Sequence, residues 1–271
     1  MIPHDAGAAG VAVFAGYARI GGVCGRYAAT KDPATLAAEF DAIDDTGAEP
    51  PRADYNVAPT KQVVTVVERH PRDDEGRADE SLTERSLRMM RWGLVPHWAK
   101  DVKVGSRMIN TRAESAAEKP AFRSALARRR CLVPADGWYE WKREGKHKQP
   151  FYMTRTDGSS LALAGIWATW RPTDAADDEP PLVTCSIITT DAVGQLADIH
   201  DRMPLMLPRP VWRRWLDPDS PDVSALLTAP DEELVAALEL RPISDAVNKV
   251  GNNGPRLLER VDLDQDQPTL L

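Results

Sequence analysis

Apolar segments of strand length recur along most of the chain, and they constrain its fold more than any other sequence feature. Each is bounded by polar residues, glycine or proline, which is typical of β-strands. Strands are therefore predicted over residues 63–67, 87–94, 131–133, 139–142, 151–154, 161–167 and 182–189. No apolar stretch is long enough for a transmembrane helix, which needs about 18 residues or more, so no membrane partner is expected.

A few helices are expected to flank the strands. Residues 33–44 predict an amphipathic helix with an apolar face of Leu36, Phe40 and Ile43. Phe122 and Leu126, among good helix formers, predict a longer helix over residues 113–130. Shorter helices are predicted over residues 190–199, 209–215 and 231–238, and exposed polar loops over 71–83 and 171–181. Strands in mixed order with few helices indicate an α+β fold, with a curved mixed sheet or partly closed β-barrel as core.

Length and cysteine usage limit the domain organisation. With 271 residues, 42% of them hydrophobic, the chain can bury one sizeable core. We expect one domain over residues 23–258, a non-native or cleaved extension over 1–22, and a polar tail over 259–271. The three cysteines include no CxxC pair, so neither a disulfide framework nor a zinc site is indicated, and a cytoplasmic location is expected.

Basic residues are concentrated in one segment of an acidic chain. The net charge is −7, yet residues 85–150 contain 16 Lys and Arg against 6 Asp and Glu, whereas the remainder contains 18 against 35. Four of the eight tryptophans lie in the same segment, namely Trp92, Trp98, Trp138 and Trp141. Cations beside indole rings favour a surface that binds phosphates and stacks on bases, although a solvated basic face has the same composition.

Cys24 offers the most distinctive chemistry in the sequence. Arg26 is two residues away, and a nearby cation is expected to lower the thiol pKa, although free cysteines are more often inert packing. Val23 can be written by a GTG codon, which bacteria also use as a start, so we expect translation to begin there and methionine removal to leave Cys24 N-terminal. The α-amine and thiol of Cys24 could then condense with an aldehyde, through a Schiff base, to a five-membered thiazolidine.

Six ordered stretches resemble the motifs of a known family. They are Cys24-Gly25-Arg26-Tyr27, Tyr55-Asn56-Val57-Ala58-Pro59-Thr60, Arg91-Trp92-Gly93-Leu94-Val95-Pro96, Ile109-Asn110-Thr111-Arg112-Ala113-Glu114, Pro134-Ala135-Asp136-Gly137-Trp138-Tyr139-Glu140-Trp141 and Ile199-His200-Asp201-Arg202-Met203-Pro204. Over nearly all of residues 23–258 the chain resembles the SRAP family, the SOS-response-associated peptidases whose members crosslink to abasic sites. The family's cysteine is normally residue two, so position 24 departs from the pattern. A start at residue 23 explains this better than cleavage by the family's proposed self-processing activity.

The resemblance implies roles for four residues at the site. Cys24 is implied to be the crosslinking nucleophile, and Asn110 to hold the sugar or the Cys24 backbone. Glu140 is implied to be the general acid and base, and His200 to transfer a proton during sugar-ring opening or crosslink reversal. From the residues alone, Glu140 between two aromatic residues is expected to have a raised pKa. From the residues alone, an asparagine after a strand is more often a turn former, and His200 could equally be a residue at a helix end.

Six residues are expected to contact DNA. The candidates for phosphate contacts are Arg26, Arg112 and Arg202, and those for wedges or stacking platforms are Pro59, Trp92 and Trp98. Arg112 shares a face with Asn110 if that segment is extended. Trp138 and Trp141 could instead be core residues. The histidines lack ligand spacing, so neither a metal nor a cofactor is expected.

The leading hypothesis is a monomeric abasic-site sensor that binds single-stranded DNA and forms a thiazolidine crosslink through Cys24, with possible lyase and autopeptidase activity. One alternative is a cysteine peptidase or self-processing hydrolase, with Cys24 as nucleophile and His200 or Glu140 as base. Another is a noncovalent single-strand-binding module that uses residues 85–150. Such a module would keep its affinity without the Cys24 thiol.

Overall fold

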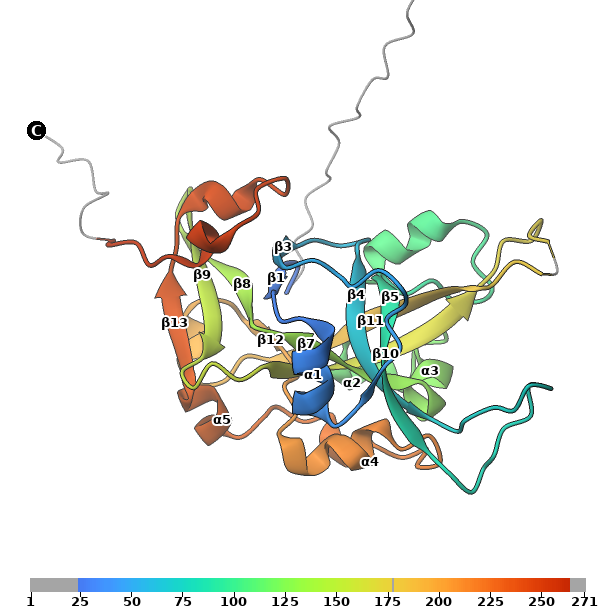
Figure 1. The fold of residues 1–271 in the computed structure, drawn as a ribbon. Helices are drawn as coiled ribbons and strands as arrows, with labels where there is room; N and C mark the ends of the chain where they lie inside the picture. The colour runs from blue at the N-terminus through green and yellow to red at the C-terminus, as the bar shows by residue number, and fades with distance from the viewer. Residues whose placement is uncertain (1–23, 177, 264–271) are drawn as a thin grey trace, which may run out of the picture.

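The computed structural model describes residues 24–176 and 178–263, in which strands are more extensive than helices (Figure 1). The strands are β1 (Tyr27–Ala29), β2 (Ile43–Asp44), β3 (Asp54–Val57), β4 (Gln62–Arg69), β5 (Glu84–Trp92), β6 (Asn110–Arg112), β7 (Arg130–Ala135), β8 (Gly137–Glu144), β9 (His147–Arg155), β10 (Leu161–Trp170), β11 (Leu182–Asp191), β12 (Arg202–Pro204) and β13 (Leu238–Pro242). The α-helices are α1 (Pro33–Phe40), α2 (Ala113–Ala116), α3 (Arg123–Arg128), α4 (Trp212–Leu216) and α5 (Glu232–Ala236). Short 3-10 helices cover Val102–Arg107, Gly194–Asp198, Arg209–Val211, Ser224–Leu226, Asp245–Asn248 and Pro255–Leu258.

The strands form two sheets. The smaller has the order β13-β9-β8-β1-β3, and the larger has the order β12-β11-β10-β7-β4-β5-β2, with β6 beside β11. β5 also pairs in parallel with β11 at Arg91 and Trp92, so that β11, β10, β7, β4 and β5 close into a ring. The predicted α+β fold with a partly closed barrel is therefore confirmed.

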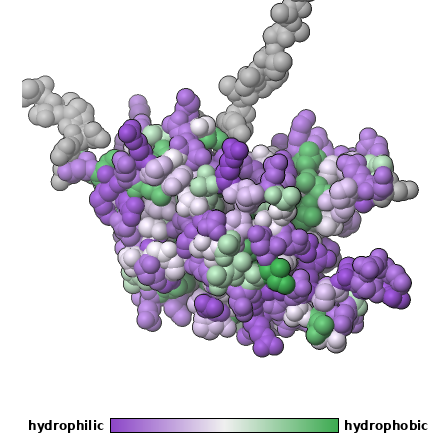
Figure 2. Space-filling model, viewed as in Figure 1, coloured by the Kyte–Doolittle hydropathy of each residue, from purple (hydrophilic) through white to green (hydrophobic). Residues whose placement is uncertain are grey.

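Each strand predicted from an apolar run is present, and the polar loops lie where expected. Residues 71–83 connect β4 to β5, and Figure 2 shows the protruding end of this hairpin covered by hydrophilic side chains. Residues 171–181 connect β10 to β11. The sequence pattern therefore locates the strands, since alternating burial and β-branched residues are local signals.

Two of the predicted helices differ from the structure. The helix expected over residues 113–130 is two short helices, α2 and α3, because Pro120 lies between them and cannot donate a helical backbone hydrogen bond. α1 ends at Phe40, where Asp41 takes a left-handed φ of 53°, so Ile43 is 55% exposed in β2 rather than part of an apolar helix face.

The three shorter predicted helices are partly correct. The first prediction, over residues 190–199, is wrong at its start because β11 continues to Asp191, and only Gly194–Asp198 is helical, as a 3-10 helix. The other two correspond to Arg209–Val211 followed by α4, and to α5.

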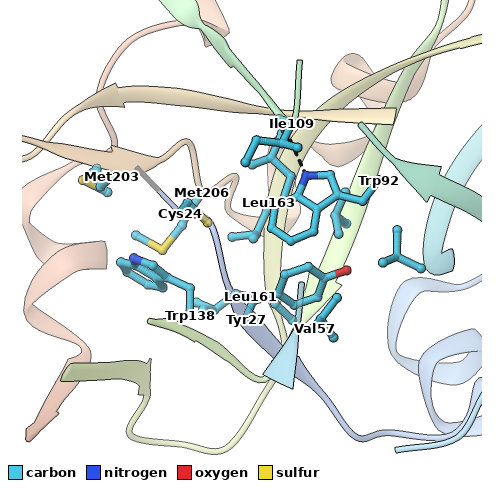
Figure 3. Close-up of a cluster of buried hydrophobic side chains, with 14 of the residues drawn as sticks. Cys24, Tyr27, Val57, Trp92, Ile109, Trp138, Leu161, Leu163, Met203 and Met206 are labelled. Carbon is cyan, nitrogen blue, oxygen red and sulfur yellow. Dashed lines mark hydrogen bonds between the residues drawn. The ribbon is translucent and has the colours of Figure 1, made fainter. Parts of the chain in front are cut away.

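The barrel interior contains one of the buried apolar clusters, which includes the three thiols (Figure 3). Cys24, Cys131 and Cys185 belong to this cluster, all buried and none in a disulfide. Figure 3 shows Cys24 at one side of the cluster, near Trp138, Met203 and Met206. The thiols therefore lie in apolar surroundings, where the neutral form is favoured.

Candidate functional site

Cys24 and Glu140 meet at the start of β1. The backbone N–H of Cys24 donates a hydrogen bond of 2.5 Å to Oε1 of Glu140, across 116 residues of sequence. The register of β1 against β8 pairs Tyr27 with Trp138, and the N–H of Tyr139 donates to the carbonyl of Arg26 at 3.0 Å. This antiparallel register brings the residues that precede β1 alongside Glu140.

Burial controls the protonation of both groups. Glu140 is 3% exposed, and its pKa is raised to about 8 by burial and by the charge of Asp201, against the opposing hydrogen bond from Cys24. The raised pKa predicted for Glu140 is thus confirmed. The pKa of the Cys24 thiol is raised well above its usual value, first by burial and then by Glu140. The prediction that Arg26 lowers this thiol pKa is wrong.

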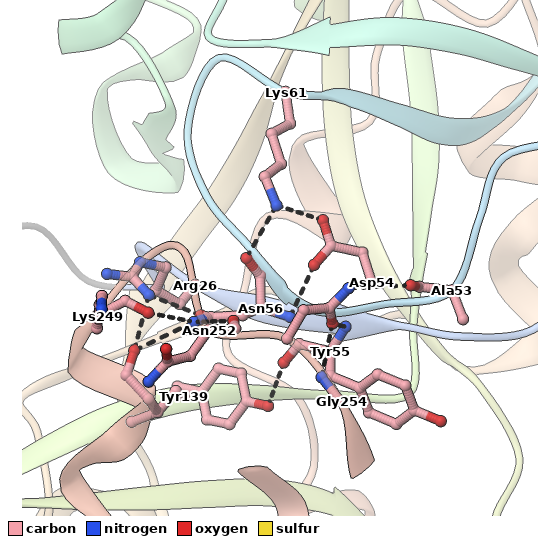
Figure 4. Close-up of polar contacts among 12 residues, drawn as sticks. Arg26, Ala53, Asp54, Tyr55, Asn56, Lys61, Tyr139, Lys249, Asn252 and Gly254 are labelled. Atoms are coloured by element: carbon pink, nitrogen blue, oxygen red, sulfur yellow. Dashed lines mark hydrogen bonds and ion pairs between the residues drawn. The ribbon is translucent and has the colours of Figure 1, made fainter. Parts of the chain in front are cut away.

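The guanidinium of Arg26 contacts Asn56 and the segment of residues 247–252, called the C-terminal loop below, instead of the thiol (Figure 4). Its Nη1 donates to Oδ1 of Asn56 at 2.6 Å and to the carbonyl of Val247 at 3.0 Å, and its Nη2 donates to the carbonyl of Asn248 at 3.3 Å. The buried amide of Asn56 donates in turn to the carbonyls of Val247, Lys249 and Asn252. Arg26 therefore anchors β1 to this loop, and its phosphate contact stays a prediction.

His200 and Asp201 lie between the 3-10 helix Gly194–Asp198 and β12, and the charge of Asp201 raises the pKa of Glu140. Nδ1 of His200 is 3.0 Å from the backbone N–H of Arg202 and 2.8 Å from Oδ1 of Asp201. The neutral ring can accept from the N–H, and the protonated ring can donate to the carboxylate. Both protonation states have a partner at Nδ1, which leaves Nε2 for a substrate.

Asn110 and Arg112 lie on β6, which pairs in parallel with β11. Asn110 is opposite Ile187 and Arg112 is opposite Thr189, so the segment is extended and the two side chains share a face, as predicted. Asn110 is half-buried and Arg112 is exposed. A substrate could therefore reach the Arg112 guanidinium.

Arg202 is buried and paired with acids, contrary to the prediction of a phosphate contact. It is 8% exposed, donates two hydrogen bonds to Glu114 at 2.7 and 3.0 Å, and contacts Asp191 at 2.5 Å. Its Nη2 also donates to the carbonyl of Thr189 at 2.8 Å. These bonds join β12, β11 and α2, so Arg202 holds the loop that carries His200 in place.

The three predicted wedges and platforms occupy different environments. Trp92 is fully buried, its Nε1 donates to the carbonyl of Ile109 at 2.9 Å, and its ring lies edge-on to Tyr27 at 5.2 Å. The predicted base platform at Trp92 is therefore wrong, because no face of the ring is available. Trp98 is 55% exposed, and Pro59 is half-buried in the β3–β4 turn beside the Trp92 carbonyl, so both stay candidates.

Sequence reasoning missed three polar residues that shape the site, although each lies within a quoted motif. Asn56 fixes the C-terminal loop, Glu114 pairs with Arg202, and Asp201 raises the pKa of Glu140. Their positions in the motifs were the only available signal, because their partners are distant in sequence. Trp138 is a fully buried core residue, which was one of the two alternatives for it. Trp141 donates through Nε1 to Oδ1 of Asn248 at 2.7 Å.

Within residues 24–176 and 178–263, no three His, Cys, Asp or Glu side chains are grouped so that they could hold a metal ion. In the same ranges no helix combines the length and apolar character required to cross a bilayer.

Comparison with known proteins identifies the class. The sequence model described as SOS response associated peptidase (SRAP) matches residues 23–250. The chain therefore belongs to the SRAP family. A solved structure from Bacteroides thetaiotaomicron has the same fold, with a TM-score of 0.71 at 24% identity, and the match covers 88% of this chain and all of that one.

Relatives from bacteria and a vertebrate carry the same protein name. The abasic site processing protein YoqW of Bacillus subtilis is 38% identical over 206 residues, which covers 76% of this chain and 85% of the relative. The abasic site processing protein YedK of Escherichia coli is 33% identical, over 88% of this chain and 100% of the relative. The abasic site processing protein HMCES of Gallus gallus is 32% identical, over 78% and 67%.

Proposed function

We propose that this chain processes abasic sites in single-stranded DNA by capturing the sugar aldehyde on Cys24 as a thiazolidine. The observation that carries the proposal is the contact of the Cys24 backbone nitrogen with buried Glu140 at 2.5 Å. The contact supports the proposal because, without the Val23–Cys24 peptide bond, an amine and a thiol would both lie beside a proton-transfer group. Family membership and relatives described as abasic site processing proteins support the same substrate.

The reaction balances without a cofactor. Glu140 takes a proton from the Cys24 ammonium, and the free amine attacks the aldehyde carbon of the ring-opened deoxyribose. The carbinolamine loses its hydroxyl as water, with the proton supplied by Glu140, and a Schiff base forms. The thiol sulfur then adds to the imine carbon, its proton passes to nitrogen, and the ring closes. Protein and DNA are joined with the loss of one water.

Burial of the thiol supports this order of steps. Because burial and Glu140 raise the thiol pKa, little thiolate is present before the amine reacts. The same burial argues against the cysteine peptidase alternative, which needs a thiolate, because burial and the Glu140 charge both favour the neutral thiol. His200 is suited to donate from Nε2 to the sugar ring oxygen as the ring opens.

Intact mass spectrometry tests the proposal. Protein beginning at Cys24, mixed with an abasic single-stranded oligonucleotide, is expected to gain the oligonucleotide mass minus one water. The same oligonucleotide with an intact base is the control. Protein that retains residues before Cys24 should form no adduct, because its nitrogen is an amide. An adduct on the extended protein would contradict the amine chemistry.

Glu140→Gln is expected to slow crosslinking by about 10²–10⁴-fold, the usual contribution of a positioned general acid and base. With a carboxyl pKa of about 8, the ionised base increases as pH rises toward 8, so the wild-type rate should rise from pH 6 to about 8 and then level. The Gln variant should lose the contribution of the carboxyl to this titration and keep that of the Cys24 α-amine, whose ordinary pKa is about 7.7–8.0. Rates from rapid-quench denaturing gels measure both effects, and a variant rate equal to the wild-type rate across this pH range would remove Glu140 from proton transfer.

Stability offers a second readout for the same carboxyl. A carboxyl whose folded-state pKa is raised binds more protons when folded than when unfolded, so it destabilises the protein progressively as pH rises from about 4.5 toward 8. Glu140→Gln removes this pH-dependent destabilisation, because the amide does not ionise. The stability difference between variant and wild type should therefore grow in favour of the variant over this range, as urea unfolding at several pH values would show.

A further inference from the structure

Three linked hollows lie beside β4, β10 and α3. The first hollow, which Trp98 lines, shares Arg129 and Thr169 with the middle hollow. The middle hollow shares Arg69 and Trp167 with the third. The middle hollow has a volume of about 440 Å³. We call the three together the arginine groove and define it by Arg69, Arg72, Arg88, Arg128, Arg129 and Trp98.

Five arginines and a single acidic side chain, Asp45, line the groove. In the described part of the chain, Arg88 is the one groove arginine that forms an ion pair with an acidic side chain, Asp45 at 2.5 Å. Burial lowers the pKa of the Arg69 guanidinium, and the charges of Arg88, Arg72 and Arg129 lower it further. Like charges held together raise the free energy of the unliganded protein, and a bound polyanion relieves that repulsion.

The fold holds the groove in place. Arg69 ends β4, and its guanidinium lies 5.0 Å from the centre of the Trp167 ring. The N–H of Trp167 donates to the carbonyl of Arg129 at 2.8 Å, which fixes the chain just after α3. Arg72 and Arg128 are exposed, and at the first hollow the 55% exposed Trp98 offers a ring face. Cations beside an accessible indole are the surface that single-stranded nucleic acids bind.

We propose that the arginine groove binds the phosphodiester backbone of the DNA strand that flanks the lesion held at Cys24. The proposal rests on the proposed function and adds a second contact region to it. Val183 lines the groove, whereas Thr189 on the same strand pairs with Arg112 at the site. Six residues of extended strand span about 20 Å. That distance corresponds to about six phosphates at 3.4 Å per nucleotide of one helical strand.

The test compares two charge reversals of equal size. The double variant Arg72→Glu/Arg128→Glu alters the groove, and Arg213→Glu/Arg214→Glu alters two equally exposed arginines on α4 as the matched control. Each is titrated with a long abasic oligonucleotide, whose flanks reach the groove, and with a short one whose flanks end before it. The groove variant should need at least about 10-fold more long oligonucleotide for half-maximal crosslinking, with a logarithmic salt slope smaller by about 1.4 for two phosphates.

The controls separate this proposal from the proposed function. With the short oligonucleotide, and at saturating long oligonucleotide, the groove variant should crosslink at the wild-type rate. If it matches the Arg213/Arg214 control on the long oligonucleotide, the groove proposal is overturned while crosslinking stands. If wild-type protein forms no adduct, the proposed function fails. Fluorescence anisotropy with an undamaged single strand then decides the groove, because equal affinities of the two double variants would reject it and a specific loss would retain it.

Discussion

Replacing Cys24 with alanine is expected to abolish covalent capture of an abasic oligonucleotide and to leave noncovalent affinity nearly unchanged. The side chain is fully buried, so it adds no contact surface for flanking DNA. Without sulfur the Schiff base cannot close to a thiazolidine, and hydrolysis returns the aldehyde. Denaturing gels measure the adduct, and anisotropy with a non-reactive abasic analogue measures the affinity.

The other two thiols provide matched controls. Cys131 and Cys185 are as deeply buried as Cys24, and their pKa values are also raised by burial. Neither thiol has an α-amine beside it, so Cys131→Ala and Cys185→Ala should crosslink like the wild type. Cys24→Ser should form an imine that borohydride traps but that heat reverses. A stable adduct on Cys24→Ala, or its loss in either control, would contradict the thiazolidine mechanism.

Local sequence patterns made the sheets predictable, and the pattern along β5 also predicts that Trp92 is buried. Along β5, Met90 and Trp92 point into the barrel while Arg91 between them is half-buried on the other face. This period of two places Trp92 in the core. Its membership of a basic, tryptophan-rich segment suggested a DNA surface instead, because composition over 66 residues ignores which face each side chain occupies.

The polar contacts of the site could not be derived from local sequence, because their partners are remote. Asn56 binds carbonyls 191 to 196 residues away, and Arg202 pairs with Glu114 across 88 residues. Only the tertiary fold determines which cations are free for phosphate and which neutralise acids. Motif resemblance placed Cys24, Glu140, Asn110 and His200 in one family site. The resemblance did not indicate that Arg202 pairs with Glu114 and Asp191.

The basic segment likewise divides into structural and exposed cations. Arg130 is 2% exposed, and Arg85 pairs with Glu68 at 2.9 Å, so neither can serve as a free phosphate contact. Arg128, two residues before Arg130, is exposed in the arginine groove. The local excess of positive charge is therefore real in sequence, but only part of it reaches a surface that DNA could contact.

Arg130→Met is expected to lower the free energy of unfolding by about 3–5 kcal/mol, the cost of breaking a buried polar network. The guanidinium donates to five backbone carbonyls, those of Leu126, Ala127, Trp215, Asp217 and Ser220. These bonds join α3 to α4 and to the chain that follows it. A thioether of similar length fills the space but donates nothing, so buried carbonyls lose their partners. Urea unfolding followed by circular dichroism measures the loss.

Arg128→Met is the matched control, since the same substitution two residues away removes an exposed side chain. It should change stability by no more than about 0.5 kcal/mol. Because Arg128 lies in the arginine groove, it should weaken binding to long oligonucleotides, whereas Arg130→Met should lose stability and keep its affinity while folded. Equal stability of the two variants would mean that solvent replaces the five bonds of Arg130, and equal affinity losses would mean that the two cations act through one general electrostatic field rather than through separate contacts.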